Sequence, residues 1–211
     1  MAIAVMAVLA LLSWRGIDAL VRTQQHVQSR VDQVAVLQTG LAQWTADLEA
    51  LMELSPLPAV DFDGRVLRLV RVDNSQPDRP LRVVGWSRRA VAQAHEGRGS
   101  WVRWQSPPLR DRAALDEAWR QVQQWGQVAS AQDQALEVAV VGLDGWQLLY
   151  FRNNAWSNPL SSAGTEAGSA DNRPSTTPEG IRLVLRLSAG QPLTGEITRD
   201  WMRPSQLESR E

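Results

Sequence analysis

The chain has 211 residues, enough for one compact domain with a long appendage, and its 22 basic and 23 acidic side chains give a formal net charge of −1. Because there is no basic surplus to neutralise phosphates, the composition argues against a nucleic-acid-binding protein. Cysteine is absent, which excludes disulfides, thiol nucleophiles and cysteine-based metal sites.

Residues 1–54 predict one uninterrupted helix. They open with 14 uncharged, mostly apolar residues, MAIAVMAVLALLSW, and continue as an amphipathic stretch up to the break at Ser55-Pro56-Leu57-Pro58. At about 1.5 Å per residue this helix would be roughly 80 Å long, more than a domain of this size can bury along its own surface. Part of the helix is therefore expected to pack against another protein.

Apolar side chains from residue 17 onward recur every three, four or seven positions, which places them on one side of a helix. Gln24 and Gln38 occupy the two missing places in this row, and Leu51 extends it. Because the spacing is mixed and glutamines interrupt the row, we expect a specific contact with a different chain rather than a stable homodimer. The residues predicted to contact partner helices are Ile17, Leu20, Val27, Val31, Val34, Leu41, Trp44 and Leu48.

Residues 1–14 predict part of a membrane segment, and residues 15–54 an amphipathic stalk. The apolar run falls short of the ~18 to 20 residues that cross a bilayer, so residues upstream of Met1 would have to complete the span. Trp14, at the end of the run, fits the headgroup level of a membrane. Two other interpretations remain open: a buried core helix, and a signal peptide, which the lack of a basic start disfavours.

Residues 55–204 predict a β-rich head and residues 205–211 a frayed tail. A period of three to four over Asp111–Trp125 predicts one short helix, and Asp144-Gly145 predicts a hairpin between two strands. The fold class is therefore α+β, a long N-terminal helix followed by a mostly antiparallel sheet with one short helix. The predicted strands are Arg65–Val72, Leu81–Ser87, Trp101–Gln105, Gln134–Val141, Gly145–Arg152, Ile181–Ser188 and Gly195–Trp201.

The sequence contains no pattern typical of catalysis or metal binding. Its two histidines, His26 and His95, are far apart, and neither has a second ligand at metal-binding spacing. No Gly-x-Ser-x-Gly elbow is present, and turn formation explains the Asp-Gly pairs. We therefore expect no enzyme activity, no cofactor, no metal and no small-molecule substrate. Most of the ten tryptophans are expected in the core.

An apolar half-helix, an amphipathic second half and a small β-rich head together form the plan of type IV pilin-like proteins. Several stretches are more specific, and they resemble the J class of minor pseudopilins of the type II secretion system. The resemblance covers nearly the whole chain. These stretches are Met6–Gln24, Gly85–Arg89, Trp104–Leu109, Phe151–Pro159 and Thr198–Trp201.

The resemblance implies a structural subunit for protein secretion, with a single transmembrane helix in the bacterial inner membrane and its head in the periplasm. J-class pseudopilins join I- and K-type minor pseudopilins in a hetero-oligomeric complex at the tip of a short pseudopilus. Family precursors carry a basic leader that is cleaved before a residue that becomes methylated. The leader and about seven mature residues are expected upstream of Met1, which would lengthen the apolar run to roughly 21 residues, enough to cross a bilayer.

Two alternative functions remain open at this point. One is a minor type IV pilin that serves pilus assembly or DNA uptake. The other is a membrane-anchored periplasmic enzyme or ligand-binding domain, which would need convergent ionisable groups in a pocket.

Overall fold

The computed structural model describes residues 2–90, 99–161, 177–189 and 193–204, so His95 and the predicted tail 205–211 lie outside the described residues. The described part contains three helices and eight strands. In chain order they are α1 (Ala2–Glu49), β1 (Val60–Phe62), β2 (Val66–Val72), β3 (Leu81–Ala90), β4 (Gly99–Gln105), α2 (Arg112–Gln127), α3 (Ala131–Ala135), β5 (Glu137–Arg152), β6 (Ala155–Ser157), β7 (Gly180–Leu187) and β8 (Gly195–Met202).

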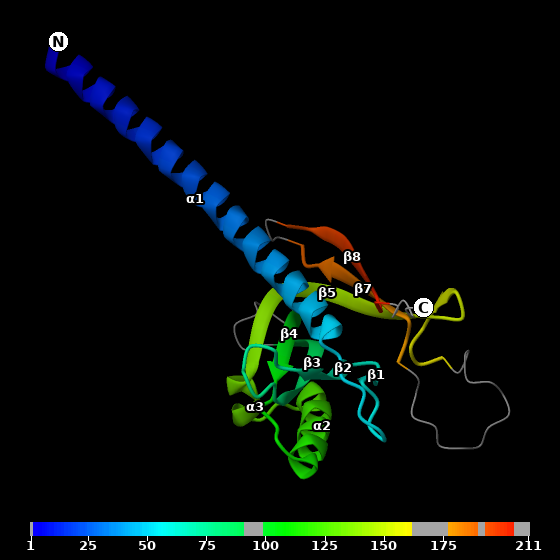
Figure 1. Ribbon diagram of the computed structural model, residues 1–211. Coiled ribbons are helices and arrows are strands. Elements are labelled where there is room, and N and C mark those ends of the chain that lie inside the picture. Colours follow the sequence, from blue (N-terminus) through cyan, green and yellow to red (C-terminus); the bar gives the residue numbers. More distant parts are fainter. Residues whose placement is uncertain (1, 91–98, 162–176, 190–192, 205–211) are drawn as a thin grey trace, which may run out of the picture.

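The helix α1 is continuous over 48 residues, which confirms the predicted rod. Figure 1 shows its first part extending away from the rest of the molecule and its last part lying across the sheet. It ends at Glu49 rather than Leu54, because the following backbone joins the sheet: the Met52 amide donates to the Val70 carbonyl at 2.9 Å. Among the described residues, no helix combines the length and the hydropathy of a membrane span.

All the strands belong to one antiparallel sheet, so the predicted fold class is confirmed. Its order is β1-β2-β3-β4-β5-β7-β8, and β6 pairs with β5 outside this path. The long strand β5 connects two parts of the sheet, since its first half pairs with β4 and its second half with β7. Five of the seven predicted strands are present with small shifts at their ends, and the other two form the single strand β5.

The predicted hairpin at Asp144-Gly145 is wrong. Both flanking segments belong to the single strand β5, and Asp144 lies at a register shift where Leu143 pairs with Leu187 and Gly145 with Arg186. Asp-Gly here occupies an irregular position within a strand rather than a turn. The second half of β5 pairs with β7 instead of folding back on the first half as a hairpin.

The two long helices cover opposite faces of the sheet. Alternate residues of β2 separate the two cores: Leu67 and Leu69 join the core under α1, whereas Val66 and Val70 join the core under α2. The same alternation places Trp101 under α1 and Val102 under α2. Strands β2, β3 and β4 therefore lie between α1 and α2, as Figure 1 shows.

The predicted short helix corresponds to α2, but a second short helix, α3, follows it. Asp111 caps α2 by accepting a hydrogen bond from the Ala114 amide at 2.8 Å, and a buried stripe from Leu115 to Trp125 faces the sheet. In α3, Ser130 and Asp133 form a reciprocal capping box. Such a helix of five residues has too few positions to show a hydrophobic period, so the sequence did not predict it.

Candidate functional site

Three tryptophans fix the inner part of α1 to the head. Trp44 from α1 meets Trp86 of β3 edge-on, with ring centroids 5.5 Å apart, and lies 6.0 Å from Trp101 of β4. Trp86 and Trp101 stack on each other at 4.4 Å. All three side chains are fully buried. Aromatic pairs of this kind contribute about 0.5 to 1.5 kcal/mol beyond the burial of their surface.

The structure gives Trp44 and Leu48 a role different from the predicted contact with another chain. Both are buried, together with Leu37, in this chain's own core, and Leu41 packs half-buried against the same core. The reason is proximity: the apolar face of the attached sheet covers this end of the row within the same molecule. No surface of Trp44 or Leu48 remains for a partner.

Asp47 is a buried carboxylate at the same contact. Its oxygens accept hydrogen bonds from the Arg103 Nε and Nη2 atoms, both at 2.8 Å, and from Arg71 Nη1 at 2.5 Å. The Trp86 indole N–H donates to Asp47 at 2.9 Å, and so does the Gln43 amide. Residues from α1, β2, β3 and β4 therefore meet at one fully buried carboxylate, which fixes the helix to the sheet in a single orientation.

Asp47 was not singled out by the sequence reasoning. Its signal is local: an acidic residue stands between Trp44 and Leu48 on the side of the helix that turns to the core. Isolated acidic residues are rarely buried without a partner, so its position predicts a cationic partner on the sheet. Which arginines supply it depends on strand register, which the sequence does not fix.

Gly40 allows the close approach between α1 and the first half of β5. A Cβ atom built at this position would overlap with Val140 Cγ1 and would lie 3.3 Å from Trp101 Cζ3. Glycine costs a helix interior about 1 kcal/mol relative to alanine, so its presence here requires a compensating gain. The gain is the contact of the helix backbone with β4 and β5.

Four of the predicted contact residues lie on the outer part of α1 and are exposed to solvent. Ile17, Leu20, Val27 and Val31 expose 60%, 62%, 59% and 54% of their surface, whereas Val34 is half-buried. Trp14 is also exposed, at 73%. These four residues, which we call the outer stripe, extend over about 20 Å of helix at 1.5 Å per residue.

The outer stripe does not face the direction of the buried residues. At roughly 100° per residue, Val27 and Val31 lie about a quarter of a turn from Trp44 and Leu48. A row with a seven-residue repeat drifts by ~20° per heptad around a straight helix, which produces part of this offset. The outer stripe therefore faces sideways from the head, where another chain can reach it.

Two carboxylates of the head, Asp73 and Asp133, are held by hydrogen bonds from nearby residues. Hydrogen bonds from Ser75 and Arg82 hold the pKa of Asp73 at about 2, below its usual 3.8, and order the loop after β2. For Asp133, burial acts to raise the pKa, but hydrogen bonds from Ser130 and Gln121 outweigh it and lower the pKa. These carboxylates are bound by their neighbours and do not converge on a pocket.

His26 is exposed on the outer part of α1. In the part of the chain that the structure describes, no three His, Asp or Glu side chains are placed to hold a metal ion. The outer stripe is the candidate functional site.

Comparisons with known proteins give similarity to solved structures alone. No family model matches the chain, and no curated protein matches it. Among solved structures it is similar to a chain of the crystal structure of the GspK-GspI-GspJ complex from the type 2 secretion system of enterotoxigenic Escherichia coli. The two chains share 19% sequence identity over 82% of this chain and 99% of the other, with a TM-score of 0.48.

Proposed function

We propose that this protein is a non-catalytic assembly subunit, a J-class minor pseudopilin of a type II secretion system. The observation that carries the proposal is the outer stripe: an apolar row on a helix whose inner end is fixed to the head and whose outer part the head does not cover. A domain that functioned alone would gain nothing from such a helix. A subunit that packs beside other helices requires one.

The energetics favour a protein contact along the outer stripe. Full burial of a valine, leucine or isoleucine side chain contributes about 1.5 to 3 kcal/mol, so four half-exposed or more exposed residues offer several kcal/mol to a partner. Single exposed apolar residues are common on protein surfaces and need no explanation. A row of four at helical spacing on an isolated helix is different, because it matches the packing surface of a neighbouring helix.

The start of α1 supports a membrane location. Residues 2–13 contain no charged side chain, and Trp14 with Arg15 marks the end of the apolar run. In our proposal this run belongs to a single span of the bacterial inner membrane, and the head lies in the periplasm. Subunits then stay in the lipid until their apolar halves pack on one another.

The choice of the J class rests on the sequence resemblance around β6 and β8. Trp156-Ser157-Asn158-Pro159 and Thr198-Arg199-Asp200-Trp201 belong to it, and the two stretches come together in the fold. Arg182 of β7 lies over the Trp156 ring at 4.3 Å and pairs with Asp200 of β8 at 2.6 Å. I- and K-type minor pseudopilins are accordingly the proposed partners in a hetero-oligomeric tip complex.

The proposal is tested by placing charge in the outer stripe. We expect the V27D/V31D variant to lose co-purification with I- and K-type minor pseudopilins by at least about tenfold, the factor that follows from 1.4 kcal/mol of lost binding energy. The matched control is Q25D/S29D, which adds the same two charges on the opposite side of the same exposed helix segment.

The head should keep its fold in both variants, because residues 25–31 are exposed. Near-ultraviolet circular dichroism of the tryptophan core checks this. Co-purification that survives V27D/V31D, or that falls equally in Q25D/S29D, would contradict an interface along the outer stripe. A gene context with pilus rather than secretion components would instead favour the type IV pilin alternative.

A further inference from the structure

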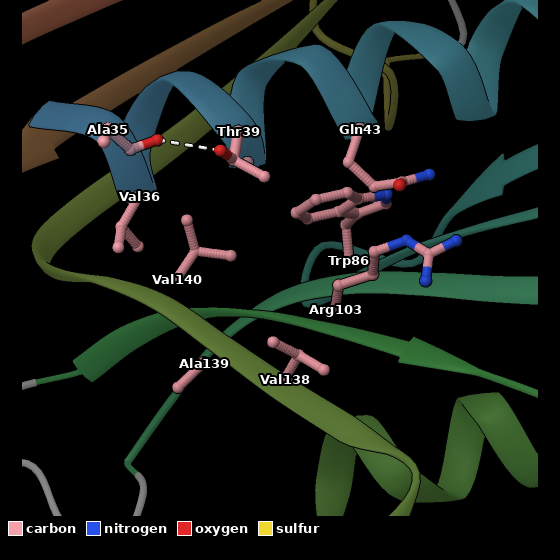
Figure 2. Close-up of a pocket in the computed structure, with 10 residues that line it drawn as sticks. Ala35, Val36, Thr39, Gln43, Trp86, Arg103, Val138, Ala139 and Val140 are labelled. Atoms are coloured by element: carbon pink, nitrogen blue, oxygen red, sulfur yellow. Dashed lines mark hydrogen bonds between the residues drawn. The ribbon is translucent and has the colours of Figure 1, made fainter. Parts of the chain in front are cut away.

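A groove lies where α1 crosses the first half of β5. It encloses about 390 Å³ between Ala35, Val36 and Thr39 on the helix and Val138 and Val140 on the strand. Figure 2 shows Ala35, Val36 and Val140 at one end of the groove, with the Arg103 guanidinium and the Gln43 amide at the other. Val36 and Val138 expose 48% and 63% of their surface at its rim. The groove is thus apolar with one polar end.

The strand beside this groove has an open edge. β5 pairs with β4 from Glu137 onward, but on its other side pairing with β7 begins only at Leu143. The Leu136 carbonyl accepts a hydrogen bond from the Gln105 amide, so Leu136 and Val138 direct their backbone groups toward β4. Glu137 and Ala139 direct theirs outward, where no strand of the described residues pairs with them.

The polar end of the groove carries an unbalanced positive charge. Two guanidinium groups, those of Arg71 and Arg103, share the single carboxylate of Asp47. Arg103 donates from Nε and Nη2 to Asp47 and from Nη2 to Gln105, and its side chain also lines the groove. This side chain is 13% exposed, so a carboxylate placed beside it would interact with the guanidinium with little competition from water.

We propose that this groove binds an extended segment of a partner polypeptide that carries a carboxylate beside an apolar side chain. The carboxylate meets Arg103, the apolar side chain fills the space against Val36 and Val140, and the backbone adds a short strand to the edge at Glu137 and Ala139. A helix cannot pair with this strand edge, because its own backbone groups are already paired. The charge complementarity at Arg103 selects an acidic segment over a neutral one.

This site is independent of the proposed function. The outer stripe ends at Val31, whereas the groove begins at Ala35 and depends on β5, so variants of one leave the other intact. A failure of one proposal therefore does not imply a failure of the other.

The test uses V138E and its matched control V138Q in the full chain. Val138 pairs directly with Arg103 across β4 and β5, and its side chain is on the surface. A glutamate there places a carboxylate of this chain at the polar end of the groove, where it competes with the carboxylate of the segment, whereas a glutamine of the same shape carries no charge. The chain with Val138 and V138Q should bind an acidic segment, and V138E should not.

The probes are two short capped peptides of alternating valine and threonine, with a central glutamate in one and a central glutamine in the other. Binding is followed by the backbone amide resonances of Glu137 and Ala139. We expect the glutamate peptide to bind roughly tenfold more tightly than the glutamine peptide, the factor for one charge-assisted hydrogen bond, and this preference to vanish in V138E and persist in V138Q.

Three results would overturn the proposal. The first is equal affinity for the two peptides. The second is binding of dodecanoate with the same Glu137 and Ala139 response but no binding of either peptide, which would assign the groove to a small apolar acid. The third is concentration-dependent self-association that V138E abolishes without any peptide, which would make the occupant a second copy of this chain.

Discussion

The two parts of α1 share one sequence pattern but have different surroundings. From Leu41 to Leu48 the apolar row packs on the sheet, and from Ile17 to Val31 it is exposed. Spacing alone indicates which side of a helix is apolar, and it does not indicate what covers that side. The difference lies in the residues between the apolar positions: the inner part contains Gly40 and Asp47, each of which fits one particular neighbour on the sheet.

This comparison predicts its largest effect for Trp44. Replacing Trp44 with alanine removes a fully buried side chain that packs on Trp86 and Trp101, and we expect the free energy of unfolding to fall by about 3 to 5 kcal/mol. Val27→Ala in the outer stripe should change it by less than about 0.5 kcal/mol. Urea denaturation followed by tryptophan fluorescence measures both.

Similar costs for the two variants would mean that the inner part of α1 is not packed on the sheet. A small cost for Trp44→Ala together with reduced co-purification would restore the original prediction, in which Trp44 contacts a partner helix.

The second effect concerns charge. Asp47→Asn keeps the size of the side chain but leaves Arg71 and Arg103 without a carboxylate, and we expect a loss of about 2 to 3 kcal/mol in the free energy of unfolding. The matched control is Asp32→Asn on the exposed part of the same helix, where Asp32 accepts a hydrogen bond from Gln28. That control should cost well under about 1 kcal/mol.

Thermal unfolding of the two asparagine variants separates these outcomes. Equal melting temperatures would show that the buried carboxylate contributes no more than an exposed one. The arginines would then be hydrated in the variant, and the orientation of α1 would depend on the tryptophans alone.

Much of the fold could be predicted from the sequence because it depends on local patterns. The unbroken stretch before Ser55-Pro56 gave the long helix, and alternating branched residues gave strands close to their observed bounds. The period in Asp111–Trp125 gave α2 with its buried side. Even the opposite orientation of Trp101 and Val102 follows from the period of two in a strand.

What could not be predicted depends on pairing between distant segments. Asp144-Gly145 has the local chemistry of a hairpin, and only the register of β7 beside β5 shows that the strand continues. The partners of Asp47 come from β2, β3 and β4, so they are fixed by strand order. The division of the apolar row into buried and exposed parts likewise depends on where the sheet meets the helix.

The smallest predicted effect on stability tests the contact between α1 and β5 at Gly40. Gly40→Ala should gain about 1 kcal/mol from helix propensity, but its Cβ overlaps with Val140, and overpacking costs about 1 to 3 kcal/mol. We expect a net loss of roughly 1 kcal/mol in the free energy of unfolding. In the Val140→Ala background the obstructing methyl groups are gone, so the same Gly40→Ala change should become neutral or stabilising.

Chemical denaturation of the two single variants and the double variant gives the coupling between the two sites. The sign change is what identifies the close approach of α1 to β5. If Gly40→Ala destabilises equally in both backgrounds, the helix is not held against Val140, and the difference between the inner and outer parts of α1 would have to come from Trp44 and Asp47.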